Sequence, residues 1–401
     1  MATTALVKNL ADRGVKIHLV SIVPENEFPC DSPATEEERT RAMSTLGVSE
    51  VTLVTRPSSS LLRLVSSAIL RPWTPVTLAA YATRSVRSEI SKITRQGHPD
   101  LVVYDGLHAA AGTISSLPRS NDSVPLCAQA YRAHNVESSL WFRAAGHSKN
   151  PAKKLLLSWQ GILVRAAEKR LSRRSSYLFP VSSVDELHFK TYLPSGVVRT
   201  LPIGVRVDSP GSEAPRGRNV LFIGKLDWSP NREGLEWILK NVWPHAYARA
   251  PDLTLKIVGS GKSTWLEAYR RLPGVEILGH VESVAPHYRD SLVSIVPIFY
   301  GSGTRVKAIE SSLHGRACIS TAIGVEGTGL VRDETYIHAE TSEEWIDALV
   351  SLNIGGALRL GEEARAHANH TFDPGRIADQ FIETVLPLLS RSEPLMHEAI
   401  D

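Results

Sequence analysis

Hydrophobic and polar residues alternate with two different periods along the whole chain. Short apolar runs, such as VKIHLVSIV (15–23) and PDLVVYDG (99–106), are typical of buried strands. Between them lie stretches with apolar residues at helical spacing, such as TALVKNLADRG (4–14), which ends in a glycine. The same rhythm resumes at NVLFIGKLDW (219–228) and continues towards the C-terminus. Repeated strand and helix units of this kind predict parallel α/β sheets covered by helices.

A segment rich in Pro, Gly and Ser, RTLPIGVRVDSPGSEAPRGRN (199–219), interrupts this rhythm and is interpreted as an interdomain linker. A chain of 401 residues is also longer than one ordinary domain. The sequence therefore predicts two doubly wound, Rossmann-like domains that face a cleft. We place the first domain at residues 1–205 and the second at residues 206–372. A final helix within residues 373–401 is expected to pack back towards the first domain.

The composition excludes several classes of protein. Hydrophobic residues make up 42% of the chain and charged residues 22%, which is ordinary for a globular protein. A net charge of +3 is too small for a nucleic-acid-binding surface, so no nucleic-acid partner is expected. Cys30, Cys127 and Cys318 form no C-x-x-C pair, which argues against a zinc site and suits a reducing compartment. With no signal-peptide pattern and no apolar run of roughly 18 residues, the sequence predicts a cytoplasmic protein.

One stretch leaves a peripheral membrane contact open. SSLLRLVSSAILRPW (59–73) is apolar and carries arginines, so it could lie against the inner face of a membrane. The alternative is an amphipathic helix that packs on its own domain.

The stretch GSGTRVKAIESSLHG (301–315) has the features of a nucleotide site. It follows an apolar run, opens with a glycine turn and continues with helical spacing. A helix that begins near Thr304 would direct unpaired N–H groups and its dipole at an anion, and Arg305 and Lys307 would add positive charge. Glu310 would share a helix face with Lys307 and could accept a pair of sugar hydroxyls. The alternative is an ordinary capped helix with a solvated basic face.

Residues 219–330 resemble the donor-binding domain of family 4 glycosyltransferases, the retaining enzymes with the GT-B fold. The resemblance lies in NVLFIGKLDWSPNREGLEW, LKIVGSG, VEILGHVES and VSIVPIFYGSGTRVKAIESSLHGRACISTAIGVEG, in that order and spacing. The first half is similar only at PDLVVYDG and AQAYRAHNVES. The resemblance implies a donor-binding second domain and an acceptor-side first domain. It also implies transfer of a sugar from a nucleotide-diphosphate donor with retention at the anomeric carbon, in polysaccharide or glycoconjugate synthesis.

The resemblance assigns roles within the glycine turn and the helix after it. Glu310 matches the second glutamate of the family's E-x7-E motif, which holds the donor ribose. The first glutamate falls at Ser302, on the donor-sugar side, so the chain departs from the family there. Gly303, Thr304 and Arg305 match the turn whose N–H groups meet the diphosphate.

Basic residues complete the implied diphosphate site. Lys225 matches a phosphate ligand that is usually arginine, and lysine keeps the charge but not the bidentate geometry. The second basic ligand of the family meets Asn231 or Arg232, and the alignment leaves this choice open. Lys307 could supply the missing charge. Ordinary surface charge is the alternative for Lys225 and Arg232.

In the first domain, His134 matches the family's active-site histidine, on the loop after a central strand. It would contact the transferred sugar near the reacting carbon, whereas a lone histidine is otherwise more often structural. Its neighbours Arg132 and Glu137 are expected to be a surface residue and a helix-cap residue.

The sequence contains no D-x-D motif, the metal-chelating device of the other large glycosyltransferase fold. We therefore expect no metal and no cofactor, with Arg305, Lys225, Lys307 and the helix N-terminus offsetting the charge of the leaving group. A front-face substitution fits best, and a covalent intermediate stays open. The expected partners are a nucleotide-sugar donor and a saccharide or lipid-linked saccharide acceptor.

The chain begins at Met1 within an apparent first helix, whereas family members open with a strand and a glycine-rich loop. Loss of that central strand would leave unpaired strand edges. A start upstream of Met1 is our hypothesis; a truncated copy and a substitute segment are the alternatives. Two other functions stay open: a degenerate, non-catalytic nucleotide-sugar-binding paralogue, and a non-hydrolysing nucleotide-sugar epimerase, which fits the motif order poorly.

Overall fold

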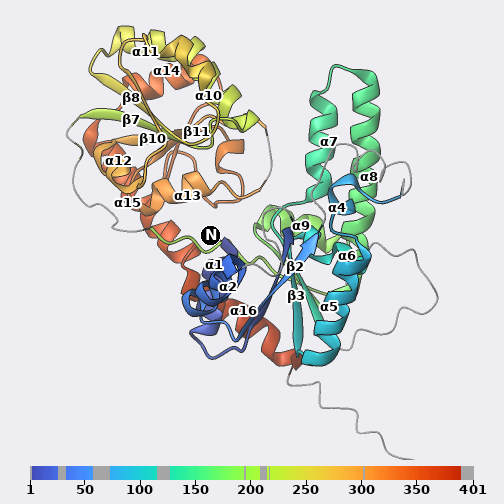
Figure 1. Cartoon of the computed structure of the whole chain (residues 1–401). Coiled ribbons are helices and arrows are strands. Elements are labelled where there is room, and N and C mark those ends of the chain that lie inside the picture. Colours follow the sequence, from blue (N-terminus) through green and yellow to red (C-terminus); the bar gives the residue numbers. More distant parts are fainter. Residues whose placement is uncertain are drawn as a thin grey trace, which may run out of the picture. The chain divides into compact units, whose positions relative to one another are not determined.

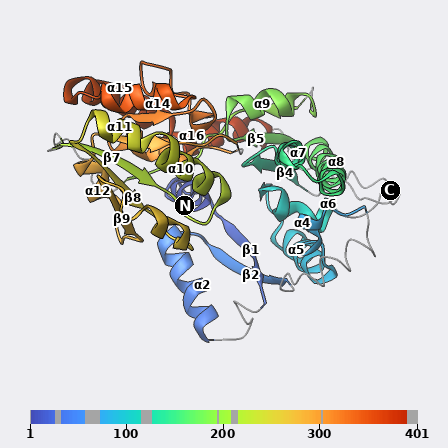
Figure 2. The ribbon, with the colours of Figure 1, turned by 90° about the horizontal axis from the view of Figure 1, so that it is seen from above.

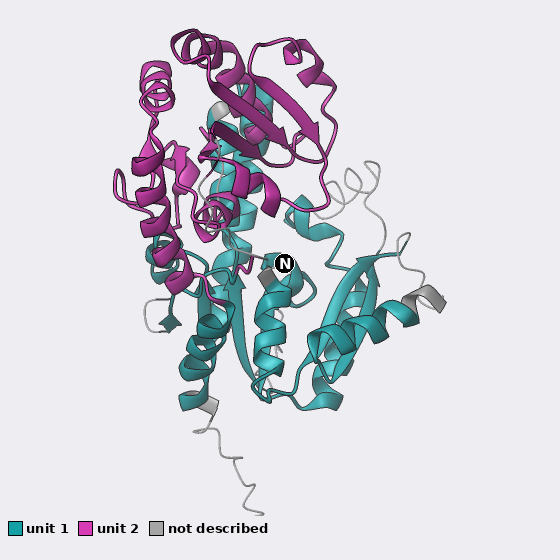
Figure 3. Cartoon of the chain, turned by 90° about the vertical axis from the view of Figure 1, so that its left-hand side faces the viewer, with its two compact units in different colours: residues 1–204, 374–401 teal, residues 205–373 magenta. Residues whose placement is uncertain are grey.

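The computed structural model describes residues 2–25, 33–56, 73–114, 127–193, 196–207, 215, 217–300 and 303–389. The chain divides into two compact units (Figure 1, Figure 3), which are unit 1, residues 1–204 with 374–401, and unit 2, residues 205–373. The sequence-based boundaries fell after residues 205 and 372. Each unit combines parallel strands with helices, so the predicted α/β class is confirmed.

Unit 2 contains one six-stranded parallel sheet with the order β12-β11-β10-β7-β8-β9. Its strands are β7 (Arg218–Ile223), β8 (Leu253–Val258), β9 (Val275–Gly279), β10 (Val293–Val296), β11 (Cys318–Ser320) and β12 (Ile337–His338). Alternate residues of β7 enter different cores, because Val220 and Phe222 join the largest apolar cluster while Leu221 packs with Tyr288. Burial on both faces explains why the strands read as continuous apolar runs.

Helices connect the strands of unit 2. They are α10 (Ser229–Asn241), α11 (Trp243–Arg249), η2 (Thr264–Tyr269), α12 (Ala285–Asp290), α13 (Val306–Leu313), η3 (Ile323–Val325), α14 (Ser342–Val350) and α15 (Ile354–Thr371). The closest packing occurs at glycines. A methyl group at Gly234 of α10 would overlap the carbonyl oxygen of Pro297, and one at Gly361 of α15 would overlap that of Gly315.

The strands of unit 1 form two separate parallel sheets within the described residues. One pairs β1 (His18–Pro24) with β2 (Glu50–Arg56), and the other has the order β3-β4-β5-β6. The strands of the second sheet are β3 (Leu101–Asp105), β4 (Ala128–Ala133), β5 (Tyr177–Pro180) and β6 (Val197–Val198). Figure 2 shows β1 and β2 as a pair apart from β4 and β5. Each sheet is thus a separate ladder, and β1 and β3 are edge strands.

The helices of unit 1 include one from the C-terminal part of the chain. They are α1 (Ala2–Ala11), α2 (Pro33–Leu46), α4 (Val76–Ala79), α5 (Arg84–Gly97), η1 (Leu107–Ala110), α6 (Ala111–Ile114), α7 (Glu137–His147), α8 (Pro151–Arg174), α9 (Ser183–Lys190) and α16 (Pro374–Leu389). Helix α16 packs on α1 and β5 through an apolar cluster that contains Leu6, Phe179 and Phe381. The Tyr177 hydroxyl donates to the Val385 carbonyl at 2.8 Å.

Local sequence explains where the helices that flank the functional region begin. Ser182 caps α9, since its hydroxyl accepts from the Asp185 amide at 3.1 Å. Asn150 caps α8 in the same way, and Pro151 follows at the first helical position. Within the described residues, no helix is both long and apolar enough to cross a membrane. The stretch considered for membrane contact lies, up to residue 72, outside the described residues.

Candidate functional site

The sheet of unit 2 reverses its winding between β7 and β10. From β7 the chain proceeds to β8 and β9 on one side and then to β10, β11 and β12 on the other. Ligands of doubly wound sheets bind beyond the carboxyl ends of the two strands at such a reversal. Lys225 lies two residues after β7, and the segment 303–307 lies after β10. The structure therefore brings these two predicted segments to one crevice of the fold.

The turn after β10 has the backbone conformation that its glycine predicts. Gly303 has a φ of +87°, which glycine adopts without strain. Helix α13 begins at Val306 rather than near Thr304, because Arg305, with φ −83° and ψ 74°, is its non-helical N-cap. Among the described residues, the Thr304 hydroxyl is buried without a hydrogen-bond partner. Ser302 lies outside the described residues.

Arg305 and Lys307 both have side chains that hold the turn in place. Arg305 is buried, and its Nε donates to the Ile323 carbonyl at 2.9 Å, which joins the start of α13 to η3. The Lys307 ammonium donates to the Asn231 side-chain oxygen at 2.5 Å and lies 4.9 Å from the centre of the Phe222 ring. Burial and the nearby Arg305 charge lower the pKa of Lys307 to about 7. The Glu310 carboxylate acts in the opposite direction and raises this pKa.

Asn231 links the two segments of the crevice. Its side-chain amide accepts from Lys307 and donates to the Lys225 carbonyl at 2.9 Å. Asn231 is buried, so it is a tie between α13 and the loop after β7. Its alternative in the alignment, Arg232, is exposed and lies 5.6 Å from the centre of the Trp265 ring.

Glu310 lies one turn into α13, on the same face as Lys307. Its side chain is half-buried, and no described residue donates a hydrogen bond to its carboxylate. Burial raises the pKa of Glu310, and the Lys307 charge partly opposes this. A half-buried acceptor without a partner is costly unless a ligand supplies the donors. Hydroxyl groups of a sugar have the required chemistry.

Lys225 is the most accessible of the predicted basic residues. Its side chain is 67% exposed, and its ammonium lies 3.8 Å from the nearer Asp227 carboxylate oxygen. The loop that carries it is fixed, since the Leu226 amide donates to the Ser260 carbonyl at 2.7 Å. The side chain can therefore turn towards an anion at the crevice without a change of the backbone.

In unit 1, His134 follows the carboxyl end of β4 and contacts Asp105 at the end of β3. The distance from His134 Nε2 to Asp105 Oδ1 is 2.7 Å. The same oxygen accepts from Arg132 Nη1 at 3.2 Å, and Asp105 Oδ2 accepts from the Thr3 hydroxyl at 2.5 Å. Burial alone would raise the pKa of Asp105, but the His134 hydrogen bond and the Arg132 charge together hold it well below its usual value.

Sequence reasoning missed Asp105 and misplaced Arg132. Asp105 is the last residue of an apolar strand next to β4, and this position at a carboxyl edge was the available signal. Arg132 was expected at the surface, but it is fully buried because its strand position directs it inwards, where Asp105 balances its charge. Glu137 was expected to cap a helix, but it is the first residue of α7, whose N-cap is Val136.

A second buried carboxylate holds the N-terminus of α7. Glu168 of α8 accepts from the Ser138 amide at 3.3 Å, while Val136, the N-cap residue, provides no side-chain cap. Burial outweighs the hydrogen bonds from Ser138 and the Glu137 amide and raises the pKa of Glu168 to about 7. This group thus titrates near neutral pH at the start of the helix that follows the His134 loop.

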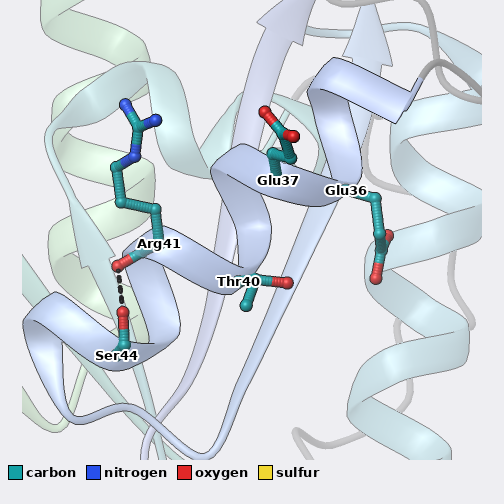
Figure 4. Close-up of a pocket in the computed structure, with 5 residues that line it drawn as sticks. All are labelled: Glu36, Glu37, Thr40, Arg41 and Ser44. Atoms are coloured by element: carbon teal, nitrogen blue, oxygen red, sulfur yellow. Dashed lines mark hydrogen bonds between the residues drawn. The ribbon is translucent and has the colours of Figure 1, made fainter.

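A hollow on helix α2 contains none of the predicted site residues. Figure 4 shows its lining, which comes from that one helix: Glu36, Glu37, Thr40, Arg41 and Ser44. The Ser44 hydroxyl donates to the Arg41 carbonyl at 3.0 Å, so part of its polarity is already satisfied. In the described part of the chain, no group of three or more His, Cys, Asp or Glu side chains is placed to hold a metal ion.

Residues 217–353 match the family model described as "Glycosyl transferases group 1". The match comprises 137 of the 401 residues and lies within unit 2. The matched part extends from β7 through α14 and so contains both strands of the winding reversal and helix α13. A Klebsiella pneumoniae protein described as "Uncharacterized 44.6 kDa protein in cps region" is 25% identical over 169 residues. That match covers 40% of this chain and 44% of the relative, so the chain spans less than half of the relative's length.

Solved structures extend the similarity to both units. Sucrose-phosphate synthase from Thermosynechococcus elongatus has a TM-score of 0.62 at 16% identity, covering 94% of this chain and 100% of that one. Anabaena HepE in complex with UDP and glucose has a TM-score of 0.60 at 14% identity, covering 96% and 95%. S. aureus TarM has a TM-score of 0.54 at 11% identity, covering 71% of this chain and 54% of TarM. The predicted GT-B fold is thereby confirmed, and the group 1 domain supports a glycosyltransferase.

Proposed function

We propose that this protein is a retaining, family 4 glycosyltransferase that moves a sugar from a nucleotide-diphosphate donor to a hydroxyl group of a saccharide or lipid-linked saccharide. The observation that carries the proposal is the crevice of unit 2, where the Gly303 turn, a basic helix start and the unpartnered Glu310 carboxylate follow one strand of the winding reversal. Phosphate at a helix start with ribose one turn further on matches a nucleoside diphosphate.

In the proposed complex, the donor diphosphate lies at the start of α13. The backbone of Gly303 and Thr304 faces it, while Arg305 and Lys307 supply positive charge from the helix side and Lys225 from the loop after β7. An anion beside Lys307 raises the pKa of its ammonium, which is otherwise about 7, and so holds it in the charged form. Glu310 accepts the ribose hydroxyls. Arg232 is a weaker candidate for binding the diphosphate, because its guanidinium lies over the Trp265 ring.

His134 is the proposed contact to the transferred sugar, and Asp105 is its positioning residue. Asp105 is anionic and accepts from the imidazole Nε2, which fixes the ring orientation and leaves Nδ1 for a substrate hydroxyl. In the proposed front-face substitution, the bond between anomeric carbon and phosphate oxygen breaks as the acceptor oxygen bonds to the same face. The acceptor proton moves to the departing phosphate, whose charge Lys225, Arg305 and the α13 amides offset without a metal ion.

The ligands in similar solved structures are of the same chemical classes as the proposed donor and acceptor. HepE was solved with UDP and glucose and also with UDP-glucose, and TarM with UDP and alpha-GlcNAc-glycerol. A role in polysaccharide or glycoconjugate synthesis at the cytoplasmic side of a membrane is part of the proposal, and the Klebsiella relative in a "cps region" supports it.

The proposal is tested by thermal unfolding with saturating UDP, GDP or ADP in the presence of EDTA. A nucleotide at about 100 times its dissociation constant adds about 2.7 kcal/mol to the free energy of unfolding. One nucleotide should stabilise the protein and so name the donor base. Glu310→Ala should weaken its binding about 30-fold, since hydrogen bonds to a charged group contribute about 2 kcal/mol.

The matched control is Glu363→Ala, an exposed glutamate on α15 of the same unit, which should leave the shift unchanged. Binding without release of nucleotide from any sugar donor would favour the non-catalytic alternative. A folded protein that no nucleotide stabilises would contradict the proposed donor site itself.

A further inference from the structure

Helices α7 and α8 form an antiparallel hairpin that extends away from the β3–β6 sheet of unit 1 (Figure 1). Residues 137–174 hold nine of the chain's 45 Lys and Arg residues but only two of its 42 Asp and Glu residues, a formal charge of +7. The rest of the chain has 36 basic and 40 acidic residues, a formal charge of −4. The small net charge of the whole protein therefore conceals one strongly basic element.

The tip of the hairpin combines cations with exposed aliphatic side chains. Lys149, Lys153 and Lys154 are exposed and form no ion pair with any described residue. Directly after them, Leu155 is 73% exposed and Leu156 is 55% exposed. Nearer the sheet, two basic side chains of α8 are engaged within the unit, because Arg165 and Lys169 lie over the rings of Phe142 and Tyr192. The tip thus combines three exposed lysines without an ion pair to any described residue and two exposed leucines.

The position of these lysines is unfavourable for the helix itself. Lys153 and Lys154 lie in the first turn of α8, which contains no acidic residue. The positive end of the helix dipole repels cations at this position, and helix starts normally carry Asp or Glu instead. Two adjacent leucines in water add a further cost. A local arrangement that opposes the stability of its own helix is expected where a binding surface is required.

We propose that the tip of the α7–α8 hairpin docks on the surface of an anionic lipid bilayer. The lysines face lipid phosphates, and Leu155 and Leu156 enter the boundary between headgroups and acyl chains. Nucleic acid is a poorer match, because its phosphate backbone offers nothing to a pair of exposed leucines. This surface is distinct from residues 59–73 and does not depend on the proposed sugar transfer.

The test is co-sedimentation of the full chain with vesicles of phosphatidylcholine alone or of phosphatidylcholine containing one third phosphatidylglycerol. Binding should require the anionic lipid and weaken at high salt. Lys153→Gln with Lys154→Gln should reduce the partition coefficient about 30-fold, since each basic residue near the surface contributes roughly 1 kcal/mol. Leu155→Ser with Leu156→Ser should reduce it at least about tenfold.

Two matched controls should bind as the unmodified protein does. Leu187→Ser removes an equally exposed leucine from α9, where Leu187 is 70% exposed, and Lys16→Gln with Lys92→Gln removes the same charge from elsewhere in unit 1. Circular dichroism verifies that each variant is folded. Equal binding to both vesicle types, or unchanged binding of the hairpin variants, would overturn the proposal. Retention on single-stranded RNA without vesicle binding would assign the surface to nucleic acid and overturn it as well.

Discussion

The two units present their candidate residues in different ways. In unit 2, one continuous six-stranded sheet supports a crevice made largely of backbone, with a glycine turn and a helix start. In unit 1, the strands form two separate ladders, and the candidate group is a set of side chains, His134, Asp105 and Arg132, joined by hydrogen bonds. The backbone site is easier to predict from sequence, since a glycine turn requires glycines at fixed positions. A contact between side chains of two strands requires no particular spacing of residues.

The largest expected effect tests the packing that supports the unit 2 crevice. Gly234→Ala should destabilise unit 2 by about 4 kcal/mol or more, because the added methyl group overlaps the Pro297 carbonyl between α10 and the strand β10. Helix propensity alone would predict a gain of about 1 kcal/mol. Chemical denaturation monitored by circular dichroism measures the change.

Gly112→Ala in α6 of unit 1 is the matched control. A methyl group there makes only ordinary contacts, the nearest at 3.5 Å to Val86, so this variant should be neutral or slightly more stable. Equal destabilisation by the two substitutions would show that Gly234 is not more tightly packed than Gly112.

The next effect separates the side-chain site of unit 1 from nucleotide binding in unit 2. Asp105→Asn should lower kcat about 100-fold, because the proposed contact of His134 with the transferred sugar depends on the partner that orients its ring. KM for the donor and the stabilisation by nucleotide should change little. The measurement is initial velocity as a function of donor concentration and pH.

A structural role for Asp105 would instead lower stability and leave the pH profile of kcat unchanged. Combining Asp105→Asn with His134→Ala should cost no more than His134→Ala alone, since both changes remove one function. Additive losses would contradict the assigned pairing.

The smallest effect concerns the pH dependence of unit 1. The pKa of Glu168 is raised from 4.5 to about 7 in the folded state, so the native protein binds more protons than the unfolded chain between these values. Stability that is complete at pH 4.5 is therefore lost as pH rises through 7. Glu168→Gln keeps an acceptor for the Ser138 amide and should stabilise the protein at pH 8 by about 2 kcal/mol.

At pH 5 the same substitution should be nearly neutral, because Glu168 is then largely protonated. Thermal unfolding at both pH values provides the measurement. A gain of equal size at pH 5 and pH 8 would show that a buried charge is not the cause. Glu186→Gln, at a carboxylate of the same unit with a lowered pKa, should show no gain at pH 8.

Much of the fold was predictable because the apolar runs of the strands and the helical spacing between them both indicate the same α/β architecture. The apolar runs that become β7 and β8 are each followed directly by a glycine, and every residue of β10 is buried. The start of α13 was predicted two residues too early, since the pattern does not report that the Arg305 backbone is non-helical. The roles of Ser302, Gly303, Thr304, Lys225 and the other site residues remain predictions.

The contacts of the candidate site were less accessible to sequence. Nothing in the residue types indicates that Lys307 reaches Asn231, or that Asn231 holds the Lys225 carbonyl, because these partners are far apart in the chain. The pairing of Asp105 with His134 depends on β3 and β4 being neighbours in register. The membrane-facing hypothesis was placed on residues 59–73, while the exposed Leu155 and Leu156 lie on α8.

The bond from Glu168 to the Ser138 amide has a mechanical consequence. Only His134, Asn135 and Val136 separate β4 from α7, and Glu168 ties the first turn of α7 to the middle of α8. The hydrogen bond therefore joins the two helices of the hairpin at the end next to the His134 loop, so unwinding the first turn of α7 would also break this contact with α8.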